Sequence, residues 1–393
     1  MKILFYRYGS ICEPDVLECF EKSSHVVTVI DEEIYNKNLT FLQSVRLVEE
    51  AFDRSDFDCV FSINFFPAIS DLCSIYNIRY ISWIVDAPVL ELFSKSIANP
   101  CNRVFVFDRA QYEDIYRYNP KCIFHFPLAV NVESKQRIIC EAKNKETASR
   151  FSAEVSFVGS LYTEKCPMDA LSGESQYLKG FLEAIIEAQL KVYGAYFADA
   201  ALSDEVIRDF KAAMPNYYHY ELENFLTDKI IIGQYYLGNK ITAVERVRLM
   251  KLISESFSLD VYTNSDLSFA PRINAKGTCK TMTEMPLIFN QSKINLNPTS
   301  KAIRSGIDLR AFDIMACEGF MLSNYQSELC ELFVPGEDFA YYSSIEEVPE
   351  IIDYYLNHES ERREIAHNGF EKVRKSYSYD YRLNKLLLTA FEV

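Results

Sequence analysis

Several signatures of common protein classes are missing from this sequence of 393 residues. No CxxC pair occurs among its 11 cysteines, so neither a disulfide framework nor a zinc ribbon can be read from them. No stretch approaches the roughly 18 uncharged residues that a membrane-spanning helix needs. The first residues, MKILFYRYGSICEPD, are typical of a β-strand rather than of a signal peptide. These absences indicate a reducing compartment, and we expect a cytoplasmic protein without a transmembrane segment.

The short motifs of several large enzyme classes are absent as well. The sequence has no G-x-x-x-x-G-K-S/T, no G-x-G-x-x-G, no G-x-S-x-G and no H-E-x-x-H. This removes the usual P-loop, dinucleotide-binding, hydrolase-elbow and metalloprotease interpretations. No group of residues has metal-ligand spacing, so we expect no bound metal.

The charge and the aromatic content narrow the class of ligand. A formal net charge of -15 argues against binding to a nucleic acid polymer or to anionic lipid, although it does not exclude local basic pockets. The chain has 26 Tyr and 28 Phe but 1 Trp. Tyrosine-rich clefts suit polyhydroxylated ligands, which need both an apolar face and a hydroxyl partner.

The first 150 residues alternate short β-branched and aromatic runs with helical patterns, which is typical of a parallel sheet with helices on both faces. We predict a Rossmann-like domain over residues 1–150, with helices at Thr40–Asp53 and Arg109–Tyr118. The polar, mixed-charge stretch at 131–152 predicts the interdomain linker. The predicted strands are Lys2–Tyr6, Val26–Ile30, Cys59–Ile63, Tyr80–Val85, Arg103–Phe107 and Ile123–Pro127.

A second Rossmann-like domain is predicted over residues 151–378, with a helical insertion at about 169–256 and a final helix at 379–393 that packs back on the first domain. Ligands of open α/β sheets bind beyond the carboxyl ends of the strands, so a central cleft between two facing domains is the expected site. The predicted strands are one in EVSFVGSLY, Leu259–Tyr262, Lys293–Leu296, Gly319–Ser323 and Phe339–Tyr342, and the predicted helices are Gly306–Cys317, Ile345–Leu356, Glu359–Ser376 and Tyr379–Ala390.

The most informative segment is INLNPTSKAIRSGIDLRAFDIMACEGFMLSNY. An apolar strand ends, a polar loop follows, and Ser305-Gly306 is predicted to open a helix whose N-terminus favours a diphosphate. Arg310 and Asp313 are three residues apart and share a helix face, so one could bind phosphate and the other ribose hydroxyls. The alternative is an ordinary helix with a serine cap and an exposed Arg–Asp pair.

The run GIDLRAFDIMACEGFMLSNYQSELCELFVPGEDFAYY resembles the C-terminal signature of GT-B glycosyltransferases and is most similar to the CgeB-like (spore maturation protein type) branch. SYSYDYR resembles the closing segment of that branch, and EVSFVGSLY resembles the opening of its second domain. ISWIVDAP and NRVFVFDRAQYEDIY are similar to the associated N-terminal domain. The resemblance covers nearly the whole chain and implies an acceptor-side N-terminal domain and a group 1-like C-terminal domain that binds a nucleotide sugar.

The resemblance also implies roles for residues of the helix-opening loop. Many retaining GT-B enzymes have two glutamates here, and the second, which binds ribose, falls on Asp313. The first, which contacts the donor sugar, falls on Ser305, which is no carboxylate; Asp308 lies two to three residues out of register. Gly306 and Ile307 would supply backbone donors to the diphosphate.

Two loops of the second domain contain further candidates. Gly159 ends a buried strand and allows close backbone approach to a ligand, and Ser160 adds a hydroxyl. Lys165 is the nearest cation for the departing nucleoside diphosphate, or else a solvated surface lysine. Tyr262 and Thr263 follow the next strand, where related enzymes receive the nucleobase, or else form a plain strand end.

In the first domain, the strand ISWIV ends in Asp86, which is followed by Ala87-Pro88. A carboxylate at the carboxyl end of a central strand is expected at the site, where it could bind sugar hydroxyls or act as general base. The alternative is that Asp86 caps the next helix.

The function expected from the resemblance is metal-independent transfer of a hexosyl or N-acetylhexosaminyl group from a nucleoside-diphosphate sugar, with UDP favoured. The acceptor is a hydroxyl of a protein or of a surface glycan, no cofactor is needed, and Asp86, Arg310 and Asp313 are the expected catalytic residues. A homo-oligomer is compatible with the sequence. Ser305 keeps a second hypothesis open, that of an inactive GT-B-like protein that binds a nucleotide or a partner of a glycosylation system.

Overall fold

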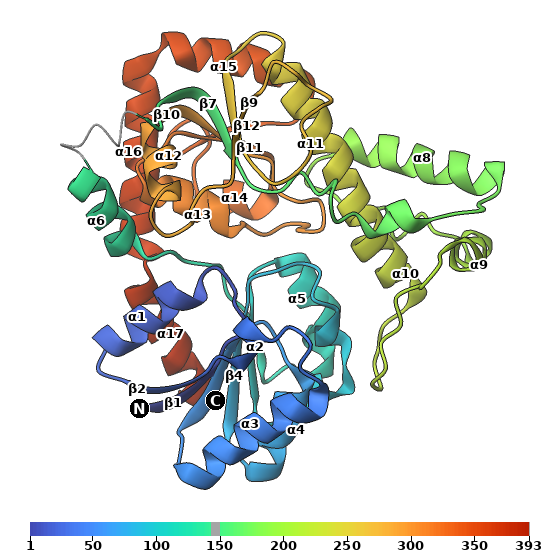
Figure 1. Ribbon diagram of the computed structural model, residues 1–393, viewed down its shortest axis with the longest axis vertical. Coiled ribbons are helices and arrows are strands. Elements are labelled where there is room, and N and C mark those ends of the chain that lie inside the picture. The colour runs from blue at the N-terminus through green and yellow to red at the C-terminus, as the bar shows by residue number, and fades with distance from the viewer. Residues whose placement is uncertain (143–149, 393) are drawn as a thin grey trace. The chain divides into compact units, whose positions relative to one another are not determined.

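The computed structural model describes residues 1–142 and 150–392. Its contacts divide the chain into two compact units (Figure 1). Unit 1 comprises Met1–Asn131, Tyr220–Leu226 and Ser376–Val393, and unit 2 comprises Val132–His219 and Thr227–Lys375. Each unit is built on its own sheet.

Unit 1 contains a six-stranded parallel sheet of order β2-β1-β3-β4-β5-β6. All six strands predicted for this half of the chain are present, and their bounds differ from the prediction by two residues or fewer. The elements of unit 1 are β1 (Lys2–Tyr6), α1 (Glu13–Lys22), β2 (Val26–Ile30), α2 (Glu32–Tyr35), α3 (Phe41–Arg54), β3 (Cys59–Ile63), α4 (Pro67–Tyr76), β4 (Arg79–Ile84), η1 (Leu90–Phe93), η2 (Lys95–Ala98), β5 (Asn102–Val106), α5 (Arg109–Ile115), η3 (Tyr116–Tyr118), β6 (Ile123–His125) and α17 (Tyr379–Glu392).

The helices of unit 1 cover both faces of this sheet. Helices α1 and α17 contact each other, and α3 contacts α4 (Figure 1). The two pairs lie on opposite faces because the strand order reverses after β2 and parallel crossovers are right-handed. The strands between them are buried on both faces, which explains their nearly continuous apolar sequences.

Unit 2 contains a second six-stranded parallel sheet, of order β12-β11-β10-β7-β8-β9. The strand β9 was not predicted, because all four of its residues are exposed and none is a strong strand former. The elements of unit 2 are α6 (Val132–Ala142), β7 (Ala153–Val158), η4 (Pro167–Ala170), α8 (Gln176–Leu190), α9 (Asp204–Ala213), α10 (Asp228–Ile230), η5 (Ile231–Leu237), α11 (Gly238–Ser254), β8 (Leu259–Tyr262), β9 (Asn274–Gly277), α12 (Met285–Gln291), β10 (Ser292–Asn297), α13 (Leu309–Ala316), β11 (Met321–Asn324), α14 (Ser327–Leu332), β12 (Ala340–Tyr342), η6 (Ile345–Glu347), α15 (Val348–Asn357) and α16 (Glu359–Ser376).

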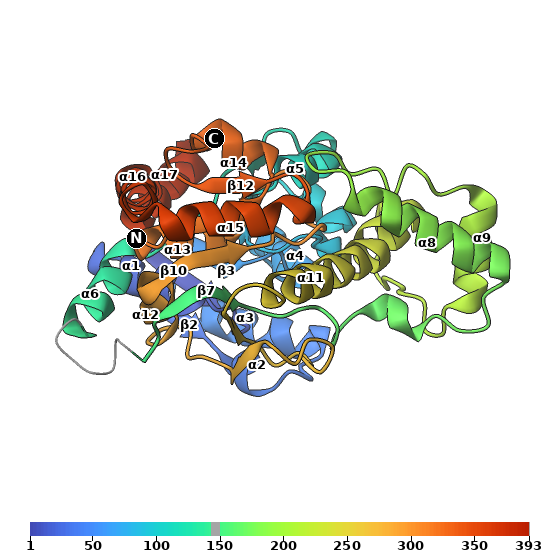
Figure 2. The same ribbon diagram turned by 90° about the horizontal axis from the view of Figure 1, so that it is seen from above.

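Helices α11 and α15 pack together on one face of the unit 2 sheet, and α6, α12 and α13 pack together on the other. The predicted helical insertion is present between β7 and β8, and α8 and α9 extend away from the sheet beyond the end of α11 (Figures 1 and 2). Two parallel sheets, each covered by helices on both faces, form the predicted two-domain α/β architecture.

The bounds of the units differ from the predicted domain limits of 150 and 378. Residues 132–142 form α6, which contacts α12 and α13, so this part of the predicted linker belongs to unit 2. Residues 143–149 of that linker lie outside the described residues. The helix was not predicted because the stretch is mostly polar, although one face of the helix is buried. At the other end, residues from Ser376 onward belong to unit 1.

A short segment of the insertion, Tyr220–Leu226, belongs to unit 1. Asn224 forms a β-bridge with Ser94, and the ring of Phe225 stacks on that of Tyr118 with centroids 4.0 Å apart. Lys95 donates to Glu223 at 2.5 Å. All of these contacts are internal to unit 1.

Gly233 lies where the insertion leaves no room for a side chain. A Cβ at this position would lie 2.4 Å from Cβ and 2.7 Å from Cα of Asp199. We expect Gly233→Ala to destabilise the protein by about 1–3 kcal/mol, because backbone has to move. Gly180 in α8 is the matched control, since a Cβ there meets nothing within 4 Å. Thermal unfolding should show a lower Tm for Gly233→Ala and an equal or higher Tm for Gly180→Ala; equal Tm values for both variants would contradict this packing.

Among the helices of the described ranges, none combines the length and the apolar composition that a membrane span requires.

Candidate functional site

The carboxyl ends of four neighbouring strands of unit 2 meet at one edge of its sheet. Strands β7, β8, β10 and β11 are parallel neighbours, so the residues that follow them lie together. Gly159 follows β7 and donates its backbone N–H to the carbonyl of Tyr262, the last residue of β8, at 3.0 Å. Asn297 ends β10 and contacts Ser323 of β11. This edge contains most of the candidate residues named from the sequence.

Arg310 of α13 points to this edge. Its Nη1 donates to Oδ1 of Asn297 at 3.2 Å, and its guanidinium lies 5.3 Å from the ring centroid of Phe157. A Cβ on Gly159 would lie 2.9 Å from Nη2 of Arg310, so the cation packs directly against the backbone of the loop. Gly159 also has φ +145°, which disfavours any side chain. Arg310 therefore occupies the space beside Gly159, and the predicted approach of a ligand to this backbone is untested.

Asn297 connects Arg310, Asp308 and Ser323 through hydrogen bonds of its side chain. Its side chain is fully buried, and its Nδ2 donates to Oδ1 of Asp308 at 3.0 Å and to Oγ of Ser323 at 3.3 Å. Because its Oδ1 accepts from Arg310, the amide orients both the cation and the carboxylate of Asp308. This role was not predicted, since an asparagine at a strand end is common.

A second arginine, Arg246 of α11, lies beneath the same loops. It is 2% exposed, and its guanidinium donates to the carbonyl oxygens of Ser160 (2.6 Å) and Pro298 (2.6 and 3.1 Å). It therefore connects the loop after β7 to the loop after β10. Burial, and after it the charge of Arg310, lowers the pKa of Arg246 to about 10, so it stays protonated at neutral pH.

The two arginines make this edge locally positive. Both guanidinium groups lie over the ring of Phe157, at 5.3 and 5.7 Å from its centroid. Their two positive charges are opposed by Asp308, which is 3.6 Å from Arg310, and by the buried Glu245, whose charge acts on Arg246. The concentration of positive charge is notable in a chain of net charge -15. Arg246 was missed in the sequence because one cation in an amphipathic helix gives no sign of being buried.

The N-terminus of α13 differs from the prediction. The helix begins at Leu309 rather than at Gly306, and its cap is Asp308, whose Oδ1 accepts from the N–H of Ala311 at 3.2 Å. A carboxylate therefore already occupies the first turn, where the sequence predicted a diphosphate. Gly306 and Ile307 are buried in the preceding loop. The expectation that they donate to the diphosphate is untested.

Ser305 is paired with the carboxylate of Glu328, a contact that was not predicted. Its hydroxyl donates to Oε1 of Glu328 at 2.8 Å, and the N–H of Glu328 donates to the carbonyl of Ser305 at 3.1 Å. Glu328 is 1% exposed and lies in the first turn of α14. This buried contact fixes the loop at Ser305, and the correspondence of this residue to a glutamate of GT-B enzymes stays a prediction.

Asp313 forms an ion pair within unit 2. Its Oδ1 lies 3.5 Å from Nζ of Lys135 in α6, and the side chains are 13% and 3% exposed. A buried lysine needs such a partner, because an uncompensated buried charge is costly. Asp313 therefore has a structural task in this chain, and the ribose contact assigned to it stays a prediction.

The loop after β7 contains Ser160 and Lys165. Oγ of Ser160 donates to Glu164 at 2.6 Å, and Ser265 donates to the other oxygen of the same carboxylate at 2.6 Å. Partial burial raises the pKa of Glu164, but the hydrogen bonds from these two hydroxyls outweigh it and lower the pKa below its usual range. Lys165 is exposed, with Nζ 4.4 Å from the ring centroid of Tyr162. Neither side chain forms a hydrogen bond or an ion pair with Arg310.

Tyr262 ends β8 beside Gly159, and Thr263 follows it. Tyr262 is 6% exposed, and burial raises the pKa of its phenol to about 12. Oγ1 of Thr263 donates to Oγ of Ser265 at 3.0 Å and accepts from its N–H at 3.1 Å. Both side chains belong to the edge that contains Arg310, and their contact with a nucleobase is untested.

In unit 1, Asp86 follows β4 at the carboxyl end of the sheet, as predicted. It is exposed, and its Oδ2 accepts from Nδ2 of Asn64 at 2.7 Å. The same amide nitrogen donates to the hydroxyl of Tyr8 at 2.8 Å, while Oδ1 of Asn64 accepts from the N–H of Val85 at 3.0 Å. Burial, and after it the charge of Asp86, raises the pKa of Tyr8. The structure thus brings an oriented carboxylate, an amide and a phenol together.

Within residues 1–142 and 150–392, no three His, Cys, Asp or Glu side chains come together in a way that could hold a metal ion.

Comparison with protein families and curated proteins gives one match. Residues 248–388 match the family described as "Glycosyl transferase-like". This range contains β8, β10, α13 and β11, and with them Arg310 and Asn297. No curated protein matches the sequence.

Solved structures match over the whole chain. HepE of Anabaena in complex with UDP-glucose is 12% identical, with a TM-score of 0.55 and coverage of 100% of both chains. Sucrose-phosphate synthase of Thermosynechococcus elongatus is 10% identical, with a TM-score of 0.56 and coverage of 100% of this chain and 99% of that one. The UDP-forming α,α-trehalose-phosphate synthase of Burkholderia vietnamiensis is 8% identical, with a TM-score of 0.53 and the same coverage. The chain has the GT-B fold, and residues 248–388 match the glycosyl transferase-like family.

Proposed function

We propose that this protein is a glycosyltransferase that uses a nucleoside-diphosphate sugar, with UDP as the favoured nucleotide. In the reaction, the bond between the anomeric carbon and the phosphate oxygen breaks, and a bond from that carbon to an acceptor oxygen forms. The acceptor hydroxyl loses its proton, and the nucleoside diphosphate leaves with an added negative charge. A group that stabilises this charge is the main requirement for catalysis.

The observation that carries the proposal is the paired guanidinium cluster at the carboxyl end of β7. Arg310 donates to Asn297 through Nη1, while its Nε and Nη2 form no hydrogen bond with any residue of the described ranges. Its side chain is 18% exposed, and Nη2 lies beside the backbone of Gly159. Two donors in one plane suit the oxygens of a phosphate group.

Arg246 supports Arg310 without needing to touch the ligand. Its donors bind the backbone of the loops after β7 and β10, and its charge adds to the positive potential at the same edge. The low exposure of this cation limits screening by water, which strengthens its effect on a nearby diphosphate. The family match over residues 248–388 and the UDP-glucose complex of HepE are consistent with a nucleotide site here.

The remaining assignments follow the sequence prediction. Asp313 would bind the ribose, Tyr262 and Thr263 would adjoin the base, and Gly159, Ser160, Lys165, Ser305, Gly306 and Ile307 would border the donor. Asp86 of unit 1 would bind a hydroxyl of the acceptor or of the sugar, or remove the proton of the acceptor. A hexosyl or N-acetylhexosaminyl group, a protein or glycan acceptor, independence of metal and membership of the CgeB-like branch belong to this proposal.

The experiment is incubation with UDP-, GDP-, dTDP- and CMP-sugars, each alone and with a mixture of simple saccharides, with detection of the released nucleotide. We expect release from a UDP-sugar above the rate of a heat-denatured sample. Anomeric NMR of the product then distinguishes inversion from retention. Absence of release from every donor, both with and without saccharides, would contradict the proposal.

Ser305 supports a second candidate, an inactive protein that binds a nucleotide. Its contact with the buried Glu328 places no exposed carboxylate at the position where related enzymes bind the donor sugar. The two candidates differ in one result: an inactive binder shows an increase in Tm with UDP but releases no nucleotide from any sugar donor.

A further inference from the structure

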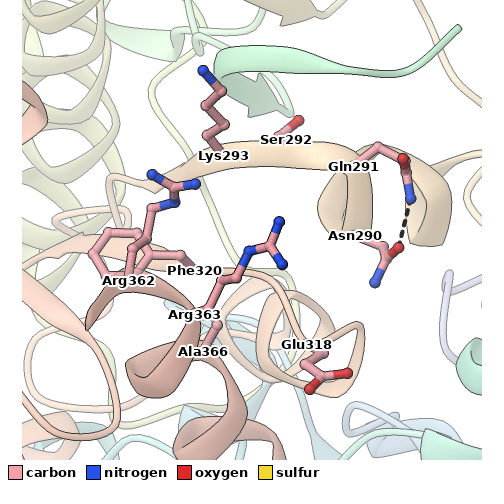
Figure 3. A pocket seen from close by; sticks show the side chains of 9 residues that line it. All are labelled: Asn290, Gln291, Ser292, Lys293, Glu318, Phe320, Arg362, Arg363 and Ala366. Atoms are coloured by element: carbon pink, nitrogen blue, oxygen red, sulfur yellow. Dashed lines mark hydrogen bonds between the residues drawn. The ribbon is translucent and has the colours of Figure 1, made fainter. Parts of the chain in front are cut away.

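A cavity of about 440 Å³ lies at the opposite end of the unit 2 sheet from Arg310. Its wall includes Ser292 and Lys293, which begin β10, and Phe320, which precedes β11 (Figure 3). Arg362 and Arg363 of α16 complete the wall. Because these are the amino ends of the strands, the cavity is separate from the candidate donor site. Its volume lies in the range of small-molecule pockets.

Arg362 is a buried cation that lacks a carboxylate partner. It is 6% exposed, and its Nη1 donates to the carbonyl of Tyr355 at 2.7 Å. No ion pair joins it to any residue of the described part of the chain. Burial lowers the pKa of Arg362, and the charge of Glu359 raises it, but that carboxylate is paired with Arg363. A guanidinium has five N–H donors, and a buried charge that is compensated only in part is costly. This side chain therefore favours an anion in the cavity that it lines.

Two further cations border the same space. Figure 3 shows the guanidinium of Arg363 extending across the cavity from α16 toward Asn290 and Gln291. Arg363 pairs with Glu359 at 2.6 Å, whereas Lys293 is exposed and forms no ion pair within the described ranges. The cavity is therefore bordered by three cations.

The other polar groups of the wall are compatible with an anion. Oγ of Ser292 is buried and has no hydrogen-bond partner, so a donor is left unused beside the cations. The one carboxylate of the wall, that of Glu318, accepts from Nδ1 of His367 at 2.9 Å when that nitrogen is protonated. Phe320 and Ala366 add an apolar surface, which a bare inorganic ion would not use.

We propose that this cavity binds a small phosphate monoester, with Arg362, Arg363 and Lys293 as its cationic partners. Guanidinium groups match the oxygens of a phosphate in pairs, and a dianion offsets more of the three positive charges than a single carboxylate can. The cavity volume and the apolar wall provide room for the organic part of the ester. This site does not depend on the proposed glycosyltransferase activity.

The test is isothermal titration calorimetry of the full chain with glycerol 3-phosphate at constant ionic strength, with glycerol as the uncharged match. We expect saturable binding of glycerol 3-phosphate and none of glycerol. The double variant Lys293→Gln/Arg363→Gln removes two exposed cations, so its fold should persist. We expect it to bind at least about tenfold more weakly.

Two controls locate the binding. Arg374→Gln removes a cation from the same helix α16, one that pairs with Glu371 away from the cavity, and should leave the affinity unchanged. Arg310→Ala alters the candidate donor site and should also leave it unchanged. The proposal is overturned by absence of binding, by equal affinity in the double variant, or by loss of binding in Arg310→Ala, which would place the phosphate at the donor site.

Discussion

Arg310→Ala is expected to lower kcat/KM for the nucleotide-sugar donor by about 100-fold or more, because it removes a preorganised cation from the position where the leaving diphosphate gains charge. The fold should persist, since the side chain is partly exposed and its contacts are with Asn297, Asp308 and the ring of Phe157. Initial rates of nucleotide release, measured over a range of donor concentrations, give the change in kcat and KM separately.

Two variants control this experiment. Arg310→Lys keeps the charge but loses the planar pair of donors, so it should recover part of the rate. Arg374→Ala removes an exposed arginine that pairs with Glu371 and should behave as the wild type. If Arg310→Ala retains wild-type rates while circular dichroism shows an intact fold, the leaving-group role assigned to this residue is wrong.

Asp86→Asn is expected to lower kcat/KM by about 10- to 100-fold, because a hydrogen bond to a charged group is worth about 1.5–3 kcal/mol. The substitution keeps the size of the side chain and removes its charge. It also places an amide opposite Nδ2 of Asn64, which now donates to Oδ2 of Asp86 at 2.7 Å. A larger loss, confined to kcat, would favour Asp86 as the base rather than as a binding group.

The control for this variant is Asp56→Asn. Asp56 is also an exposed aspartate of unit 1, but it lies before β3, at the amino end of the strands. Its replacement should leave the rate unchanged. Equal rates for Asp86→Asn and the wild type with every acceptor tested would remove Asp86 from the reaction.

The strands were the most predictable part of the fold. Interior strands of a parallel sheet are buried on both faces, so β3, β4 and β5 are continuous apolar runs between polar turns. The exposed edge strand β9, with the sequence NAKG, has no such pattern and was missed. Burial on both faces is therefore what made the sheet readable from the sequence.

The candidate site was less predictable, because it depends on contacts between residues far apart in the chain. Gly159 was recognised from its place after a buried strand, but its neighbour Arg310 comes from α13 and Arg246 from α11. The start of α13 was misplaced by three residues because Ser305-Gly306 resembles a helix opening as closely as the actual cap, Asp308. Glu328, the partner of Ser305, belongs to a helix that was not predicted.

The most direct test of the proposed function is a crystal structure of the protein in complex with UDP. We predict that the diphosphate lies at the carboxyl end of β7, with an oxygen about 3 Å from Nε or Nη2 of Arg310. A complex in which the phosphates of UDP lie out of reach of Arg310, at the cavity beside Arg362 or elsewhere on the protein, would contradict the account.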